Sequence, residues 1–346
     1  MTEDDSTDRP VVVLSMNTQS VDRLFTPGAM KQLTTLFTVV DLATDPDPDA
    51  ALDQSIGTAF AVVGQPDLTR ERLLCARKLK AIVNVEGNFL PNVDYPTCFE
   101  RGIRVLNCAP AYGRAVAEFG LGLALDLARG ITREDRAFRA GTERYLGERT
   151  ADSILLQGAD VGFIGFGNLG RSLRRLLRSF NPVLRVYDPW LPNSAIEEVG
   201  AIACPLTEVI EHSQFLFILA AATNANGGFL GRTELALVPP GARVILLSRA
   251  AVVDYEALLD AVEEGRFLAA IDVWPTEPVA ADDRARRLDG LVLSPHRAGG
   301  IPAAFSAIGD MVVDDLSSLL HGVPPVRMQA AAPELVGRYR NRPAQP

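Results

Sequence analysis

Three glycines between two apolar runs form the clearest candidate binding site in this chain. Residues 160–170 read Asp-Val-Gly-Phe-Ile-Gly-Phe-Gly-Asn-Leu-Gly, so a short strand leads into a G-x-G-x-x-G turn at Gly165, Gly167 and Gly170. The first glycine permits a tight turn, the second lets the backbone approach a pyrophosphate, and the third lets the next helix pack on the strand. Free N–H groups at the start of that helix would bind the phosphates. We therefore predict a dinucleotide-binding turn.

An acidic residue follows at the distance that this motif requires. Asp188 ends the next apolar run, about 20 residues after the glycines. A carboxylate there accepts hydrogen bonds from the adenine ribose hydroxyls and repels a 2′-phosphate, which favours NAD over NADP. A chance cluster of glycines in a loop is the alternative, and the flanking strand, helix and acid argue against it.

A catalytic set is predicted where three later apolar runs end. Arg249, Glu277 and His296 each follow such a run. Arginine can hold a 2-oxo carboxylate through two parallel hydrogen bonds and polarise the carbonyl. Histidine can donate a proton to the developing alkoxide, and a neighbouring glutamate would fix its tautomer. The residue types thus indicate carbonyl reduction beside a nicotinamide, whereas the alternative is that Arg249 and Glu277 are unrelated surface charges.

Only three histidines occur in the chain. His212 and His321 lie at predicted helix ends, where an imidazole can interact with the helix dipole, so we expect structural roles for both. His296 instead follows a short buried strand. Open α/β folds bind their ligands at the carboxyl ends of such strands, which singles His296 out as the acid/base candidate.

The composition narrows the class of protein further. The net charge of −9 argues against nucleic-acid and anionic-membrane partners. No apolar run reaches the roughly 18 residues of a membrane span, and the acidic segment 1–10 lacks an apolar signal core. The four cysteines show no C-x-x-C spacing, so we expect reduced thiols, no metal site and a cytoplasmic location.

Apolar runs that alternate with helical patterns position these residues. Such a βαβ series predicts an α/β fold with doubly wound parallel sheets. A first series precedes a long helix expected over 116–141, and a second follows it; the last helix is expected over 302–320, and the tail 329–346 should be loosely ordered. The predicted strands are 11–15, 38–42, 59–63, 81–85 and 105–108, then 161–164, 184–187, 202–205, 215–219, 243–247, 269–273 and 291–293.

On these residues, over roughly 55–325, the chain resembles the D-isomer-specific 2-hydroxyacid dehydrogenases. The resemblance rests on the glycine turn with Asp188 and on four further segments, all in the family's order: Val116-Ala117-Glu118, Ser248-Arg249 with Val253-Asp254, 271–278, and Ser294-Pro295-His296. It implies a Rossmann coenzyme domain, 109–301, inserted into a flavodoxin-like substrate domain made of 1–108 and 302–346. It also implies hinge closure and a homodimer.

The resemblance assigns roles to individual residues. Arg249 would bind the substrate, His296 would be the acid/base and Glu277 its partner, while Asp272 would hold the nicotinamide carboxamide. Further coenzyme contacts would come from Asn168, Leu169, Ala220, Leu247 and Ser248. The loop Glu86, Gly87 and Asn88 would bind the substrate carboxylate.

That loop departs from the family pattern. The usual Gly-x-Gly-x-Asp-Asn-x-Asp reads here as 85–94, with Val85 in place of the first glycine and an acid, Glu86, beside it. Ala250, Arg297 and Gly300 are also unusual. Glu86 could select a hydroxyl or cationic group on the substrate, and Arg297 or Arg114 could meet a second anionic group; alternatively these side chains point away from the site.

Three functions remain open on the sequence. The leading prediction is NAD-dependent interconversion of a 2-oxo acid and a D-2-hydroxy acid. A second keeps the fold but oxidises an oxyanion such as phosphite, and a third is an NAD-sensing corepressor-like protein that binds without turnover. The complete set of arginine, glutamate and histidine favours catalysis.

Overall fold

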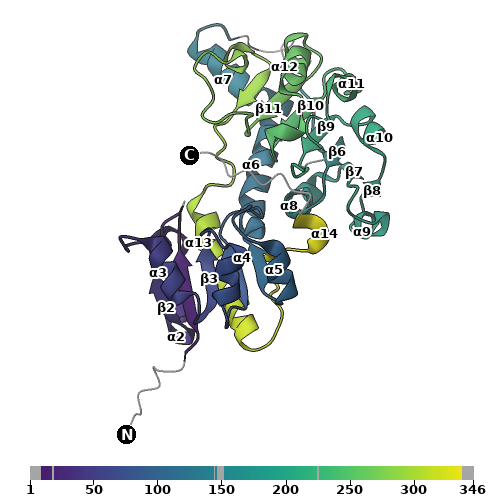
Figure 1. The fold of residues 1–346 in the computed structure, drawn as a ribbon. Coiled ribbons are helices and arrows are strands. Elements are labelled where there is room, and N and C mark those ends of the chain that lie inside the picture. The colour runs from purple at the N-terminus through teal and green to yellow at the C-terminus, as the bar shows by residue number, and fades with distance from the viewer. Residues whose placement is uncertain (1–8, 18, 144, 146–151, 224–225, 337–346) are drawn as a thin grey trace. The chain divides into compact units, whose positions relative to one another are not determined.

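The computed structural model describes the chain except for residues 1–8, 18, 144, 146–151, 224–225 and 337–346. The described residues form two compact units, one from residues 9–112 and 300–336 and one from Gly113–Gly299 (Figure 1). We call them unit 1 and unit 2. Each has its own sheet and core, so each is described by itself.

Unit 1 contains a six-stranded sheet in the order β13-β5-β4-β3-β1-β2. All neighbouring strands are parallel except β13 and β5. The order 2-1-3-4-5 of the first five strands is that of flavodoxin-like sheets, which confirms the predicted fold class for this unit. The strands are β1 (Val11–Ser15), β2 (Thr38–Asp41), β3 (Ala59–Gly64), β4 (Ala81–Asn84), β5 (Arg104–Asn107) and β13 (Gln329–Ala330).

Helices cover both faces of this sheet (Figure 1). Because side chains alternate along a strand, Val12 and Leu14 pack with α1, α2 and α13, whereas Val13 packs with α3, α4 and α5. The result is one apolar core on each face of the sheet. The helices of unit 1 are α1 (Val21–Leu24), α2 (Pro27–Leu36), α3 (Pro48–Ser55), α4 (Arg70–Cys75), α5 (Tyr95–Glu100), α13 (Pro302–Leu320) and α14 (Pro333–Val336).

Unit 2 contains a seven-stranded parallel sheet in the order β12-β11-β10-β9-β6-β7-β8. The chain runs outward from β6 to β8 and restarts at β9 on the other side of β6. This places the topological switch point between β6 and β9, as in Rossmann folds. The strands are β6 (Asp160–Ile164), β7 (Val183–Tyr187), β8 (Ile202–Ala203), β9 (Phe215–Ile218), β10 (Arg243–Leu246), β11 (Leu268–Ile271) and β12 (Leu291–Leu293).

Two apolar cores also sandwich the sheet of unit 2. Phe163, Phe215 and Phe217 pack on the face covered by α6, α8 and α9, and Ile164 and Ile218 pack on the face covered by α10, α11 and α12. The helices are α6 (Ala109–Arg129), whose first turn belongs to unit 1, α7 (Ile131–Arg139), α8 (Asn168–Leu177), α9 (Asn193–Glu197), α10 (Leu206–Glu211), α11 (Arg232–Leu235) and α12 (Tyr255–Glu263), with short 3-10 turns η2 (Arg178–Phe180), η3 (Ala250–Val252) and η4 (Arg284–Arg287).

The single long helix expected over 116–141 is wrong, because α6 and α7 are separate. Gly130 adopts a left-handed conformation (φ 65°) between them and ends α6. The carboxylate of Asp126 then accepts a hydrogen bond from the Thr132 N–H at 2.7 Å, which satisfies a donor at the start of α7.

The expectation of a loosely ordered tail is also wrong for 329–336. Gln329–Ala330 pair with the edge strand β5, and α14 follows. The fully buried carboxylate of Asp315 accepts backbone N–H groups of Arg327 and Met328, which turns the chain toward that edge. Residues 337–346 lie outside the described residues.

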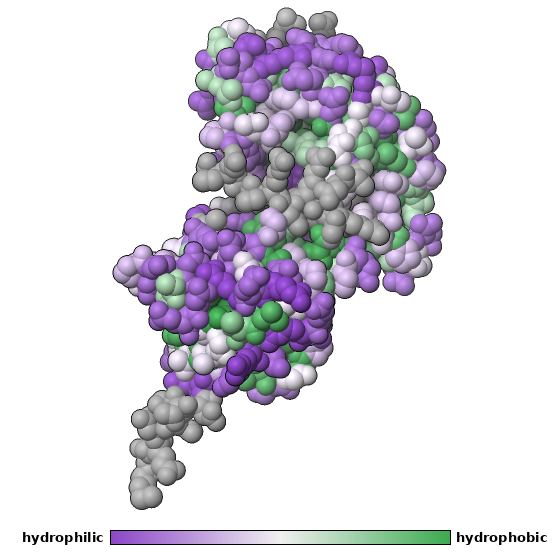
Figure 2. Space-filling view, viewed as in Figure 1, coloured by the Kyte–Doolittle hydropathy of each residue, from purple (hydrophilic) through white to green (hydrophobic). Residues whose placement is uncertain are grey.

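The visible surface of both units is largely hydrophilic (Figure 2). Among the described residues, no helix has the length and apolar character to cross a membrane. Large apolar side chains are nevertheless exposed on α7, where Ile131 and Phe138 are 59% and 61% exposed and no residue is buried.

Gly64→Ala should destabilise unit 1 by about 3 kcal/mol or more, because an added Cβ would lie 1.7 Å from the carbonyl oxygen of Ser15 at a φ of +129°. Gly102→Ala is the matched control. Its φ is +68°, but no atom lies within 4 Å of the new Cβ, so it should cost only about 1–2 kcal/mol. Thermal unfolding followed by circular dichroism checks both, and equal melting temperatures would contradict the described β1–β3 contact.

Candidate coenzyme and catalytic site

The glycine-rich turn joins β6 to α8 at the switch point. Gly165 has a φ of +99°, and a Cβ there would lie 2.7 Å from the backbone nitrogen of Ala220. A Cβ on Gly170 would lie 3.0 Å from the carbonyl oxygen of Gly165. Gly167 is the N-cap of α8, and its Cβ position faces open space. The turn therefore has tight packing on two sides and open space at a helix N-terminus, which suits a phosphate.

Asp188 lies against this turn. One carboxylate oxygen accepts the Phe166 N–H at 2.7 Å, and the other accepts the Trp190 N–H at 2.9 Å. Asp188 follows β7, the neighbour of β6, so both features share one edge of the sheet. A carboxylate has about four acceptor positions, which leaves capacity for ribose hydroxyls after these two bonds.

Ser248 gives independent support for a ligand at this edge. It follows β10, is 8% exposed, and its hydroxyl oxygen is buried without a hydrogen-bond partner in the described structure. Buried hydroxyls are nearly always paired, so this one fits a group that the protein chain does not supply. Ala220 and Leu247 follow β9 and β10 at the same edge, and Asn168 and Leu169 form the first turn of α8. These residues could hold a dinucleotide.

Glu277 and His296 form a hydrogen-bonded pair. Nδ1 of His296 lies 2.9 and 2.8 Å from the two carboxylate oxygens of Glu277. The carboxylate accepts, so Nδ1 carries the hydrogen and Nε2 is the ring atom left for a substrate. The two side chains are 38% and 31% exposed, which leaves the imidazole accessible. The structure thus brings two of the three predicted catalytic residues together.

A buried carboxylate fixes the loop that carries His296. Asp272 is 1% exposed and accepts hydrogen bonds from the Ser294 hydroxyl and from the N–H groups of Arg297 and Ala298, the latter two at 3.0 and 3.2 Å. His296 itself has a φ of +49°, an unusual conformation for a residue with a side chain. The residues predicted to touch the nicotinamide and to transfer the proton are therefore coupled through the backbone.

Trp274, which was not singled out from the sequence, supports the pair. The Trp274 N–H donates to Glu277 Oε1 at 3.1 Å, and the Trp274 indole donates to the Ser294 carbonyl at 2.8 Å. Trp274 thus ties the loop after β11 to the loop after β12. A tryptophan between a strand end and a catalytic acid was the available signal.

Arg249 lies at the same edge but is not hydrogen-bonded to the pair. It follows β10, the neighbour of β11, is exposed, and donates to the Ser248 carbonyl at 2.7 Å. Its guanidinium makes no hydrogen bond to Glu277 or His296. Each of the other two histidines donates from Nδ1 to a local backbone carbonyl, that of Glu208 for His212 and that of Ser317 for His321.

In unit 1 the predicted substrate loop follows β4. The side chain of Asn84 accepts the Glu86 N–H at 3.0 Å and donates to the Asn88 carbonyl at 2.9 Å. The Glu86 carbonyl accepts the Cys108 N–H at 3.0 Å, and Gly87 lies against the Tyr112 ring. Asn84, which the sequence analysis did not single out, therefore fixes the loop.

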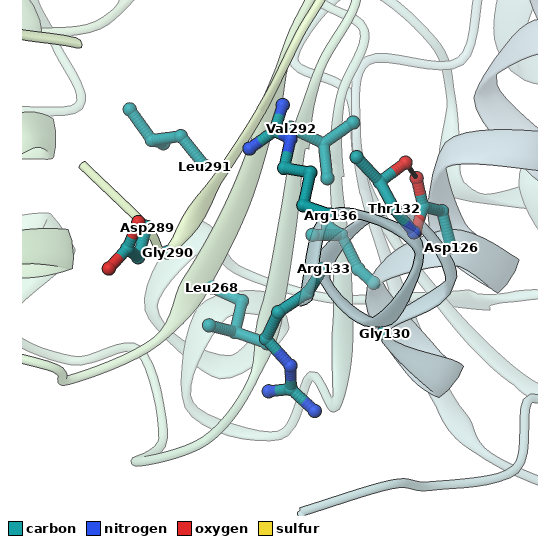
Figure 3. A pocket seen from close by; sticks show the side chains of 11 residues that line it. Asp126, Gly130, Thr132, Arg133, Arg136, Leu268, Asp289, Gly290, Leu291 and Val292 are labelled. Carbon is teal, nitrogen blue, oxygen red and sulfur yellow. Dashed lines mark hydrogen bonds between the residues drawn. The ribbon is translucent and has the colours of Figure 1, made fainter. Parts of the chain in front are cut away.

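A small pocket of unit 2 lies away from these residues (Figure 3). Asp126, Thr132 and Arg133 line one side, and Leu268 and Leu291 the other. Both leucines are the first residues of their strands, so the pocket lies at the amino edge of the sheet, opposite His296. Its volume of about 30 Å³ is enough for a molecule the size of water.

Other chemistries find little support in the described residues. They contain no group of three histidines, cysteines or acids that could hold a metal ion. Burial raises the pKa of the Cys98 thiol to about 12 and that of Cys204 to about 11, so neither is a thiolate nucleophile near neutral pH.

Residues 121–298 match the model of the D-isomer specific 2-hydroxyacid dehydrogenase NAD binding domain. The match spans the glycine turn, Asp188 and the Glu277–His296 pair. The chain belongs to the D-isomer specific 2-hydroxyacid dehydrogenase family, and unit 2 contains its NAD-binding domain. The predicted family and cofactor are thus confirmed.

Known relatives agree in sequence and fold. The chain is 28% identical to a D-3-phosphoglycerate dehydrogenase of Methanocaldococcus jannaschii over 74% of its own length, but spans only 48% of that relative. It is 28% identical to a glyoxylate reductase of Pyrococcus furiosus, with 72% of this chain and 76% of the relative aligned. A solved phosphoglycerate oxidoreductase from Rhizobium etli superposes with a TM-score of 0.86 at 42% identity, covering 94% of this chain and 99% of that one.

Gly167→Ala should leave the unliganded protein folded, because nothing lies within 4 Å of the added Cβ, yet weaken NADH binding at least roughly tenfold by blocking the pyrophosphate. Gly165→Ala should instead lower the melting temperature, because its Cβ would collide with Ala220. Calorimetric titration with NADH and a thermal melt separate the two effects. Unchanged NADH affinity in Gly167→Ala would place the dinucleotide elsewhere.

Proposed function

We propose that this protein is an NAD-dependent oxidoreductase that interconverts a 2-oxo acid and a D-2-hydroxy acid. The observation that carries the proposal is the Glu277–His296 hydrogen bond at the carboxyl edge of an NAD-binding domain. Bound NADH supplies the hydride for the substrate carbonyl carbon. The protein's residues must then hold the acid and supply one proton to the carbonyl oxygen.

His296 is the proposed proton donor, through Nε2. Glu277 holds Nδ1, so the ring presents its other nitrogen to the substrate, and the same pair accepts the proton in the reverse direction. Arg249 would bind the substrate carboxylate through its planar fork and polarise the neighbouring carbonyl. Asp272 positions the loop beneath His296, and its carboxylate would also accept from the nicotinamide carboxamide.

Unit 1 is the proposed substrate domain, and unit 2 the coenzyme domain. In unit 1, the loop Glu86, Gly87 and Asn88 would bind the substrate carboxylate through the backbone N–H groups of Gly87 and Asn88, while the Glu86 N–H donates to Asn84. The way that Asn84 holds this loop from both sides supports the assignment, because anion-binding backbone groups must be fixed in place. The proposed coenzyme contacts are Gly165, Gly167, Asn168, Leu169, Gly170, Asp188, Ala220, Leu247, Ser248 and Asp272.

The named relatives favour this activity over the other two candidates. They are named for the oxidation or reduction of small hydroxy or oxo acids: phosphoglycerate and glyoxylate. A phosphite dehydrogenase would oxidise phosphite and leave 2-oxo acids untouched, and a corepressor-like sensor would bind NADH without consuming it. A paired histidine and glutamate are needed for turnover and not for sensing.

A homodimer is the proposed assembly, and α7 is its proposed contact. Ile131 and Phe138 are exposed there on a helix that buries no side chain within the chain. Exposed apolar patches of this kind mark interaction sites. The four cysteines are unpaired, which supports the proposed cytoplasmic location.

His296→Asn should lower kcat by roughly 10²–10⁴, because the proton donor is lost, while leaving NADH affinity within about twofold. His212→Asn is the control, since the His212 side chain is hydrogen-bonded to the Glu208 carbonyl within its own turn and should keep full activity. Steady-state rates with a 2-oxo acid, and NADH titration of each variant, provide the measurement. Equal activity of both variants would remove His296 from the chemistry.

Glu86→Gln and Arg297→Ala test the unusual side chains near the proposed substrate. Arg297 is exposed and, like Arg114, has no ion-pair partner among the described residues. If Arg297 meets a second anionic group, its loss should raise KM for dicarboxylic or phosphorylated oxo acids by about tenfold and leave glyoxylate unchanged. An unchanged order of substrates in both variants would show that these side chains face away from the site.

A further inference from the structure

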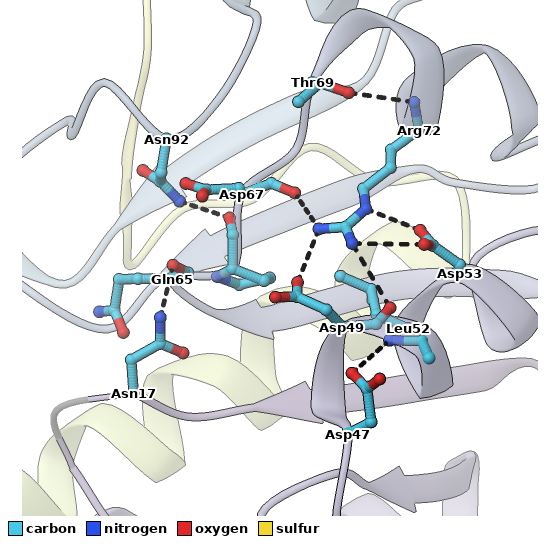
Figure 4. Close-up of polar contacts among 12 residues, drawn as sticks. Asn17, Asp47, Asp49, Leu52, Asp53, Gln65, Asp67, Thr69, Arg72 and Asn92 are labelled. Atoms are coloured by element: carbon cyan, nitrogen blue, oxygen red, sulfur yellow. Dashed lines mark hydrogen bonds and ion pairs between the residues drawn. The ribbon is translucent and has the colours of Figure 1, made fainter.

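A polar network links three neighbouring strand ends in unit 1. Asn17, beyond the end of β1, donates to the backbone carbonyl of Gln65, beyond the end of β3, at 2.9 Å (Figure 4). The Gln65 side chain donates to Asn84, the last residue of β4, at 3.0 Å. Asn92 of the following loop donates to the Pro66 carbonyl at 2.8 Å. Gln65 is therefore fixed at the same edge as the proposed carboxylate-binding loop.

Backbone groups determine which way these amides face. Asn84 Oδ1 accepts the Glu86 N–H, and Asn84 Nδ2 donates to the Asn88 carbonyl, so a flipped Asn84 would lose both bonds. Because Oδ1 faces Gln65, the Gln65 NH₂ must face Asn84 in turn. The remaining atom of the Gln65 carboxamide, Oε1, is consequently an acceptor whose position and identity are fixed by the backbone.

That acceptor has no donor. Gln65 is 6% exposed, and its Oε1 is buried without a hydrogen-bond partner in the described structure. A buried polar atom left unpaired costs about 1–3 kcal/mol, and most buried side-chain polar atoms have a partner. The network that imposes this cost also holds the substrate loop, which suggests that a bound molecule supplies the missing donor.

We propose that Gln65 Oε1 accepts a hydrogen bond from a hydroxyl on the substrate carbon next to the 2-oxo carbonyl. This inference rests on the proposed function and names its substrate class: 2-oxo acids with a hydroxyl at C3. The Gln65 NH₂ and the Glu86 N–H share one acceptor atom, so they lie at most two hydrogen-bond lengths, about 6 Å, apart. A three-carbon acid, with bonds of about 1.5 Å, is long enough to reach from that loop to Gln65.

The chemistry of the acceptor excludes a second anion at this position. Gln65 presents an oxygen, which repels a carboxylate or a phosphate and attracts a hydroxyl hydrogen. A site built to pair a substrate hydroxyl strongly rejects the analogue that lacks it, because the buried acceptor then stays unpaired. Selection at Gln65 is thus expected to appear as discrimination between two acids that differ by one hydroxyl.

The test compares hydroxypyruvate with pyruvate, which differ only in the C3 hydroxyl. We expect the intact protein to prefer hydroxypyruvate in kcat/KM by at least about 100-fold. Gln65→Met is similar in length but lacks both the acceptor and the NH₂ that donates to Asn84, so it should lower kcat/KM for hydroxypyruvate at least about tenfold more than kcat/KM for pyruvate. Gln65→Asn keeps the amide but shortens the side chain by one carbon, and it should also lower kcat/KM for hydroxypyruvate more than for pyruvate. This variant replaces Gln65→Met if Gln65→Met does not fold.

Other outcomes separate this inference from the proposed function. If the intact protein reduces pyruvate as well as hydroxypyruvate, or if either Gln65 variant lowers both rates equally, the inference is overturned while the oxidoreductase assignment stands. Preference for a phosphorylated or dicarboxylic oxo acid would overturn it in the same way. If no oxo acid is reduced at all, the proposed function itself fails.

Discussion

A carboxylate buried beneath the loop after β12 is the interaction on which the arrangement of the catalytic site depends. The carboxylate of Asp272 accepts the Ser294 hydroxyl, which precedes His296, and the backbone N–H groups of Arg297 and Ala298, which follow it. Those bonds compensate the cost of burying the Asp272 carboxylate. They also hold the backbone of His296 in its positive-φ conformation. Glu277 accepts the Trp274 N–H and the Nδ1–H of His296. Removing Asp272 would release the loop without touching the acid/base pair directly.

In unit 1 the neutral side chain of Asn84 also holds a loop by hydrogen bonds to its backbone. Asn84, at the end of a central strand, holds the backbone of the loop that follows, as Asp272 does in unit 2. Apart from the antiparallel β13, the strands of both sheets are parallel, so polar groups at strand ends gather at one edge, where helix N-termini and loops can face a ligand. The seven-stranded sheet thus positions the Glu277–His296 pair proposed for proton transfer, and the six-stranded sheet positions the amides proposed for substrate recognition.

Local signals made most of the fold predictable. The glycine spacing, Asp188 and the apolar runs identified the Rossmann unit, because short-range sterics and strand burial determine them. The break at Gly130 was not predicted, since a glycine within a helical pattern is tolerated unless a side chain such as Asp126 caps the next helix. Gln65 was not predicted either, because its role depends on a contact with Asn84 on the neighbouring strand. Asn84 was also missed, although its bonds to Glu86 and Asn88 are local in the sequence. The pairing of Glu277 with His296 was anticipated from residue type and order, whereas its support by Trp274 became visible only in three dimensions.

The central claim is that this chain turns over NADH with a 2-oxo acid. The most direct measurement follows NADH absorbance when the purified protein is mixed with a panel of 2-oxo acids bearing small, aromatic, dicarboxylic and phosphonate side groups. We expect the protein to oxidise NADH with one class of acid and to form the D-2-hydroxy product. Tight binding of NADH with no oxidation across the whole panel would contradict the account and favour a sensor or a substrate outside the 2-oxo acids.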